Sequence, residues 1–141
     1  MSKPSENQTN RSREMNECLG ALILVVEDEP SVLITTVLVL ERKGCKTIVA
    51  TDGAEAVSTY EQKKDEINIV LLDMMMPVME GDKTIEALRK INPKVKILAV
   101  SGYAKEERYE KSIKDVQAFL MKPYTIEELM ATIRKVLQHN N

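Results

Sequence analysis

Five short apolar runs recur along this 141-residue chain, and they constrain its fold more than any other feature. They occupy residues 21–26, 48–50 with its neighbours, 67–72, 95–100 and 118–121. Short runs without alternating polar residues are typical of strands that are buried on both faces, as in a parallel sheet. Because helix-like segments separate the runs, we expect a doubly wound α/β fold built on one parallel sheet.

The segments between the runs carry helix signals. Pro30 suits the first turn of a helix, and Gly44 suits a helix end. Thr125 with Glu128 three residues later forms a capping box before a strongly periodic segment. The predicted helices begin near residues 30, 52, 82, 105 and 125.

Charge and cysteine content exclude several classes of protein. The formal net charge of -2 argues against a chain that coats nucleic acid or an anionic membrane. Residues 21–40 are apolar enough to suggest a membrane span, but Glu27, Asp28 and Glu29 lie in their middle. Residues 1–18 do not resemble a signal peptide. Two cysteines cannot build a disulfide framework or a four-ligand zinc site, so we expect a cytoplasmic protein.

The chain is expected to contain one compact domain. Residues 1–19 are polar and predict a flexible tail or linker, residues 20–138 the domain, and residues 139–141 a frayed end. Neither end has room for a helix-turn-helix, so no DNA-binding output is expected in this chain.

Polar residues follow the predicted strands at one edge of the sheet. In strand order they are Glu27 and Asp28, then Asp73, Ser101, and Lys122 with Pro123. Ligands of such sheets bind beyond the carboxyl ends of the strands, so these side chains are expected to meet. Crowded carboxylates repel one another, and a hard divalent cation such as Mg²⁺ would offset that repulsion. A carboxylate beside Mg²⁺ and a lysine can attack a phosphoryl group.

Four sequence segments together resemble a known family. They read V-V-E-D-E-P, V-L-L-D-M-M-M-P-V-M-E-G, A-V-S-G-Y-A and F-L-M-K-P-Y. This combination is similar to the receiver domain of bacterial response regulators in two-component signalling, of the chemotaxis-regulator type, and to receivers fused to hybrid sensor kinases. Pro77 and Gly81 fall at the family's spacing after Asp73. The resemblance covers about residues 21–138 and implies a flavodoxin-like fold with strand order 2-1-3-4-5.

The resemblance implies a role for each residue of the site. Asp73 matches the phosphoacceptor, Asp28 the direct Mg²⁺ ligand, and Glu27 its neighbour, which acts through water. The backbone carbonyl of Met75 matches the third protein ligand, and Lys122 matches the lysine that pairs with the phosphoryl group. Many family members have two aspartates where this chain has Glu then Asp, which alters the surroundings of the metal.

The same resemblance implies a switch. Ser101 matches the hydroxyl residue that moves to the phosphoryl group, and Phe119 the aromatic that turns inward with it. Met75 and Tyr103 match positions that tune access of hydrolytic water, and the bond before Pro123 is commonly cis. The surface expected to change is residues 105–138. A histidine kinase or a histidine phosphotransfer protein would donate the phosphoryl group, and a downstream protein would bind the changed surface.

Three other functions compete with a signalling receiver, whose only chemistry is its own phosphorylation and dephosphorylation. A Mg²⁺-dependent phosphatase with an aspartyl nucleophile would need a carboxylate where this chain has Met75. A phosphate-independent scaffold of the same fold would lack Asp73 or Lys122. A flavin carrier would need a phosphate-binding loop where Glu27, Asp28 and Glu29 lie.

Overall fold

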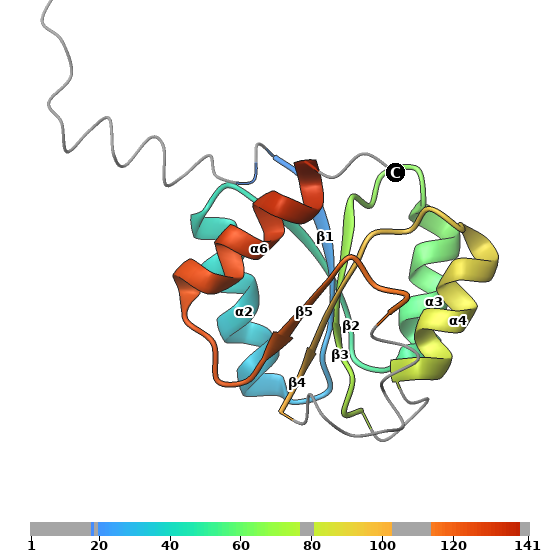
Figure 1. The fold of residues 1–141 in the computed structure, drawn as a ribbon, viewed down its shortest axis with the longest axis horizontal. Helices are drawn as coiled ribbons and strands as arrows, with labels where there is room; N and C mark the ends of the chain where they lie inside the picture. The colour runs from blue at the N-terminus through green and yellow to red at the C-terminus, as the bar shows by residue number, and fades with distance from the viewer. Residues whose placement is uncertain (1–17, 19, 77–80, 103–113, 139–141) are drawn as a thin grey trace, which may run out of the picture.

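The computed structural model describes residues 18, 20–76, 81–102 and 114–138, and these form one parallel sheet between helices (Figure 1). The strands are β1 (Leu22–Val26), β2 (Lys46–Ala50), β3 (Ile69–Asp73), β4 (Ile97–Ser101) and β5 (Ala118–Met121). All pairings are parallel, and the order across the sheet is β2-β1-β3-β4-β5. The predicted fold class and strand order are therefore confirmed.

Four helices in the described residues cover the two faces of the sheet. They are α2 (Pro30–Arg42), α3 (Gly53–Lys63), α4 (Gly81–Ile91) and α6 (Ile126–Gln138). Helices α2 and α6 lie on one face, and α3 and α4 lie on the other (Figure 1). The helix predicted to begin near residue 105 falls outside the described residues.

Alternate residues of each central strand belong to different apolar layers. In β1, Ile23 and Val25 pack in the layer beneath α2 and α6. Leu24 and Val26 pack in the layer beneath α3 and α4. Because both faces of the strand are buried, every position must be apolar, which explains the unbroken apolar runs in the sequence.

The predicted capping box of Thr125 and Glu128 forms, and Asp52 caps the start of α3 in a similar way. The Asp52 side chain accepts a hydrogen bond from the backbone of Glu55 at 2.7 Å, at the start of α3. Thr125 Oγ1 accepts one from the backbone of Glu128 at 3.0 Å, and Glu128 Oε1 reaches back to the Thr125 backbone at 3.4 Å. These contacts set where α3 and α6 begin.

The two cysteines lie together at the edge of the sheet where the strands begin. Cys18 and Cys45 form a disulfide, with their Cα atoms 4.9 Å apart. Two cysteines were too few for a disulfide framework, but the sequence reading did not anticipate this single bond.

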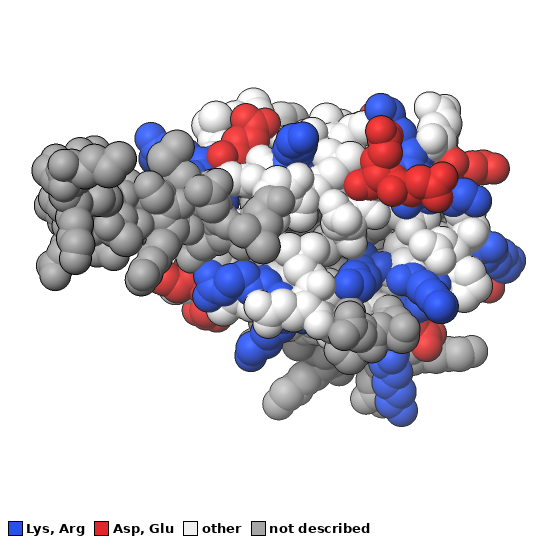
Figure 2. Space-filling view, turned by 90° about the horizontal axis from the view of Figure 1, so that it is seen from above, with Lys and Arg blue, Asp and Glu red and all other residues white. Residues whose placement is uncertain are grey.

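The molecular surface around this edge carries charges of both signs. On the face seen from above the view of Figure 1, Lys and Arg side chains lie at several separate places, and Asp and Glu side chains gather beside some of them (Figure 2). None of the described helices combines the length and the apolar character needed to cross a bilayer.

Candidate functional site

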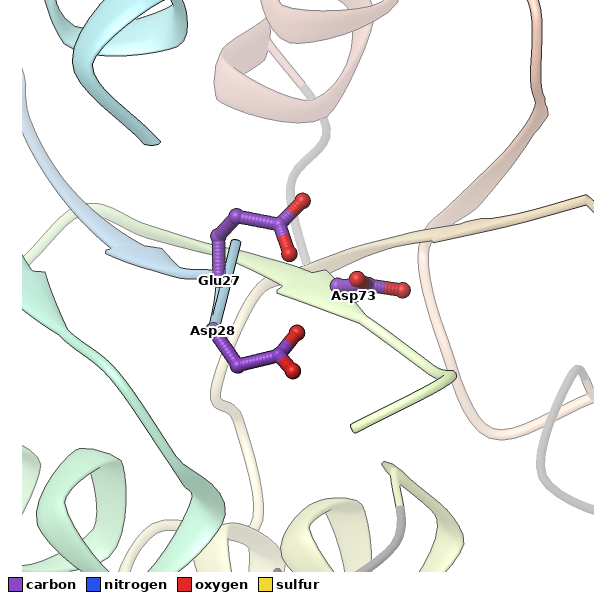
Figure 3. Close-up of side chains that lie close together, drawn as sticks. All are labelled: Glu27, Asp28 and Asp73. Carbon is purple, nitrogen blue, oxygen red and sulfur yellow. The ribbon is translucent and has the colours of Figure 1, made fainter. Parts of the chain in front are cut away.

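Three carboxylates come together where β1 and β3 end. Val26 pairs with Leu72 in the sheet, and each is followed directly by an acid, Glu27 after β1 and Asp73 at the end of β3. Asp28 comes next in the chain, and one oxygen from each of the three side chains lies within 4.8 Å of the others (Figure 3). Glu27 and Asp73 are buried, whereas Asp28 is exposed. We call these three residues, together with Lys122, the acidic pocket.

Lys122 supplies the positive charge of the acidic pocket. Its Nζ lies 3.4 Å from Glu27 Oε1 and 3.7 Å from Asp73 Oδ2. The Lys122 backbone N–H donates to the carbonyl of Ser101 at 2.9 Å, which fixes the lysine beside the end of β4. The Lys122–Pro123 peptide bond is cis, as the resemblance implied.

The close packing of these charges changes their protonation. Burial raises the pKa of Glu27 to about 7, and a hydrogen bond with Asp73 and the charge of Asp73 add to the effect. Burial acts to lower the pKa of Lys122, but the carboxylates of Asp73 and Glu27 outweigh it, and the pKa is raised. Lys122 therefore stays protonated at neutral pH, while Glu27 is partly neutral until further positive charge arrives.

The two oxygens of Asp73 face different partners. Oδ1 accepts a hydrogen bond from the backbone N–H of Met75 at 3.0 Å, and Oδ2 faces Lys122. Met74 directly follows Asp73, and its backbone N–H donates to the carbonyl of Val100 at 2.9 Å. This bond connects the turn after Asp73 to β4. Contacts on both oxygens thus hold the Asp73 carboxylate in one orientation within the acidic pocket.

Ser101 and Phe119 lie on the same face of the sheet. Ser101 is the last residue of β4 and is fully buried. Phe119 pairs with Ala99, two residues before Ser101, and packs half-buried against the layer beneath α3 and α4. Because side chains two residues apart point to the same side of a strand, both face that layer.

Gly81 fits tightly against the turn that follows Asp73. A Cβ on Gly81 would lie 2.6 Å from Met74 Sδ and 2.7 Å from Met74 Cα, closer than atoms can approach. This contact gives a steric reason for glycine at the first position of α4. The side chain of Met75, the residue after Met74, is 38% exposed. The other two residues of this region that the sequence singled out, Pro77 and Tyr103, lie outside the described residues.

Two residues beside the acidic pocket were missed at the sequence level. Tyr124 and Thr36 line the small hollow that also contacts Glu27, Asp73 and Lys122. Burial raises the pKa of Tyr124, and the charge of Lys122, together with a weaker effect of a hydrogen bond with Thr36, partly opposes that rise. Tyr124 could have been suspected because it follows the Lys122–Pro123 pair, but no sequence signal marks Thr36 inside α2.

The donors of the acidic pocket fit a hard divalent cation. All three side chains offer carboxylate oxygens, which Mg²⁺ prefers, and no sulfur or imidazole ligand is among them. Three carboxylates face one ammonium group, so negative groups outnumber positive ones, and the charge of Asp73 adds to the burial that raises the pKa of Glu27. A divalent cation would correct this imbalance.

Comparison with known proteins identifies similar chains. Residues 23–134 match the family model of the response regulator receiver domain. The sensor kinase CckA of Brucella abortus is 34% identical over 120 residues, which cover 84% of this chain and 13% of the kinase. The chain therefore spans only a small part of that relative.

Solved structures agree with the sequence match. The CheY-like receiver domain protein of Methanospirillum hungatei JF-1 superposes with a TM-score of 0.78 at 30% identity, over 84% of this chain and 94% of that chain. The response regulator TrrA of Thermotoga maritima, solved with Mg²⁺-BeF, has a TM-score of 0.74 at 26% identity. That alignment covers 83% of this chain and 99% of TrrA.

Proposed function

The chain belongs to the response regulator receiver domain family of two-component systems, and from this premise we propose that Asp73 is its phosphoacceptor. Receiver domains are signalling phosphoacceptors and not turnover enzymes. The observation that carries the proposal is the position of Asp73 Oδ2, 3.7 Å from Lys122 Nζ and beside the carboxylates of Glu27 and Asp28. An anionic nucleophile next to cationic groups is the arrangement that phosphoryl transfer needs.

The chemical step is a transfer from nitrogen to oxygen. An oxygen of Asp73 forms a bond to the phosphorus of a phosphohistidine, the phosphorus–nitrogen bond breaks, and the imidazole leaves. The product is an acyl phosphate on Asp73. Since the leaving imidazole keeps the electron pair of the broken bond, no oxidant or reductant takes part.

Lys122 would form an ion pair with the transferred phosphoryl group. Its ammonium group now lies between Glu27 and Asp73, and its raised pKa keeps it charged. Once Asp73 is phosphorylated, the phosphoryl oxygens add negative charge beside Lys122, and the lysine pairs with one of them. We expect the lysine to stabilise both the transition state and the product.

The acidic pocket would hold Mg²⁺ through oxygen ligands. Asp28 and Asp73 would bind it directly with the carbonyl of Met75, and Glu27 would act through water. When bound, Mg²⁺ supplies positive charge that offsets the phosphoryl oxygens. Glu27 has one methylene more than aspartate, so its carboxyl group reaches further toward Asp73 and Lys122.

We further propose that phosphorylation is read at β5 and α6. Ser101 would move to hydrogen-bond the phosphoryl group, and Phe119, on the same face of the sheet, would turn into the space that it leaves. The output surface would be residues 105–138, of which 114–138 are described. A downstream protein would bind this surface, and residues 20–138 would be the functional unit.

The donor would be a histidine kinase or a histidine phosphotransfer protein, and the site of action the cytoplasm. Met75 and Tyr103 would shield the acyl phosphate from water and lengthen its lifetime.

Phosphorylation by acetyl phosphate with Mg²⁺, followed by intact mass, tests the central proposal. Wild type should gain the mass of one phosphoryl group, and Asp73→Asn should gain none. Asp65→Asn, an exposed aspartate remote from the pocket, is the matched control and should behave as wild type. Equal labelling of wild type and Asp73→Asn would remove Asp73 from this role.

A further inference from the structure

The only two cysteines of the chain form a buried pair far from the acidic pocket. Cys18 is 1% exposed and Cys45 is 5% exposed, and both belong to the apolar layer beneath α2 and α6. They are 27 positions apart in the sequence, yet their Cα atoms lie within the usual distance for a disulfide.

The disulfide joins two segments at the edge where the strands begin. Cys18 precedes β1, and Cys45 lies between α2 and β2. Three backbone hydrogen bonds of 3.3, 3.2 and 2.9 Å also connect residues 18–21 with residues 43–46. The sulfur bridge is thus the one covalent tie that holds the chain before β1 against the α2–β2 turn.

The ring closed by this bond includes functional residues. It runs from Cys18 through β1, Glu27 and Asp28 to α2 and then Cys45. The two acids that follow β1 therefore lie within a covalently closed loop when the cysteines are oxidised, and within an open chain when they are reduced.

Both oxidation states are compatible with the rest of the fold. A reduced cysteine packs as a small apolar residue, so two thiols can remain in the apolar layer. The sheet pairings of β1 with β2 and β3 do not depend on the sulfur bond. Reduction would remove only the covalent link between Cys18 and Cys45. The three backbone hydrogen bonds alone would then hold residues 18–21 against residues 43–46.

From these observations we propose that Cys18 and Cys45 are a reversible thiol–disulfide modification site. Oxidation fastens the chain before β1 to the α2–β2 turn, and reduction releases it. A dithiol reductant transfers two electrons, the sulfur–sulfur bond breaks, and each Sγ takes one proton while the reductant becomes a disulfide. A disulfide oxidant such as oxidised glutathione reverses the step through a mixed disulfide. The proposal does not depend on phosphotransfer by Asp73.

Thiol counting tests whether the bond forms and breaks. The full chain is equilibrated in glutathione buffers of different redox ratio, quenched in acid, unfolded and labelled with a maleimide at neutral pH. We expect no label at the oxidising end, two labels at the reducing end, and full recovery of the first state on reoxidation. A protein that keeps two free thiols in every buffer, or that cannot be reduced without unfolding, overturns the proposal.

Hydrogen exchange tests whether the bond acts as a tie. On reduction we expect exchange at residues 18–21 to rise about tenfold or more, while β3 and β4 stay protected. The unfolding temperature should fall by roughly 10 °C, since a disulfide also restricts the unfolded chain. The wild type can be tested in both states without any substitution. Cys18→Ser cannot form the bond, so its exchange rates and unfolding temperature should match those of the reduced wild type in oxidising and in reducing buffer. Unchanged exchange at residues 18–21 would show that the bond holds nothing, and the proposal would fail.

Discussion

The carboxyl groups of Glu27 and Asp73 lie side by side because their strands are neighbours in the sheet and end at the same level. Val26 and Leu72 pair across β1 and β3, and each precedes one of the two acids. Two buried carboxyl groups at this separation cannot both be charged without a nearby cation. The acidic pocket therefore needs positive charge to offset its carboxylates, and Lys122 supplies part of that charge.

The first prediction concerns the pH dependence of stability without metal. Folding raises the pKa of Glu27 from 4.5 to about 7, so the folded protein binds more protons than the unfolded chain between these values. The free energy of unfolding should therefore fall as the pH rises through this window, by about 3 kcal/mol at most from this residue. Urea unfolding in EDTA at pH 5 and pH 7.5 measures the change. Glu27→Gln should lose this part of the pH dependence, and equal slopes for the two proteins would contradict the assignment.

The second prediction concerns magnesium. Added Mg²⁺ should raise the unfolding temperature of the wild type at neutral pH, since it binds only the folded pocket. Asp28→Asn removes a charged ligand without changing the shape of the side chain, and the affinity should fall at least about tenfold. Calorimetric titration measures the affinity directly. Asp65→Asn serves as the control, and an Asp28→Asn protein with undiminished affinity would exclude Asp28 as a ligand.

The third prediction separates the role of Lys122 from that of the metal. Lys122→Ala should slow phosphorylation by acetyl phosphate about 10²- to 10³-fold, because a preorganised cation beside the transferring group is lost. Mg²⁺ binding should persist or tighten, because the variant has one positive charge fewer in the pocket. Lys63→Ala, at an exposed ion pair with Glu66, is the matched control. Parallel loss of metal binding and phosphorylation would point to a general structural role for the lysine.

The fourth prediction concerns the turn after Asp73. Gly81→Ala should destabilise the protein by about 1–3 kcal/mol, because the new Cβ would overlap Met74. Gly102→Ala is the comparison, since a Cβ there meets nothing within 4 Å. Unfolding by denaturant measures both. Equal stability of the two variants would show that the turn relaxes freely around Met74.

The fifth prediction concerns the lifetime of the acyl phosphate. The double variant Met75→Asn, Tyr103→Ala should lose its phosphoryl group faster than wild type, because smaller or more polar side chains admit water to the phosphorus. Decay of the phosphorylated mass after removal of acetyl phosphate gives the rate. A lifetime as long in the variant as in the wild type would contradict a shielding role.

Much of the fold follows from local sequence features. The apolar runs predict strands because both faces of this sheet are covered, and the box of Thr125 and Glu128 sets the start of α6. The polar residues after the runs meet because parallel strands end at one edge of the sheet. The structure brings Glu27, Asp28, Asp73 and Lys122 together as expected.

Other features depend on tertiary geometry that short sequence patterns do not contain. The pairing of Cys18 with Cys45 requires the chain before β1 to fold back against the α2–β2 turn. Thr36 contributes to the hollow only because α2 crosses above it. The raised pKa of Glu27 depends on its burial, and its position next to Asp28 does not reveal that burial.

The disulfide and the acidic pocket lie at opposite ends of β1. Five residues of extended strand span roughly 17 Å. Neither a thiol nor a disulfide carries a net charge. A change of oxidation state at one end of β1 would therefore leave the charge balance of the acidic pocket at the other end unchanged. Oxidation of the cysteines at the start of β1 and phosphorylation at its end would then act independently on the same strand.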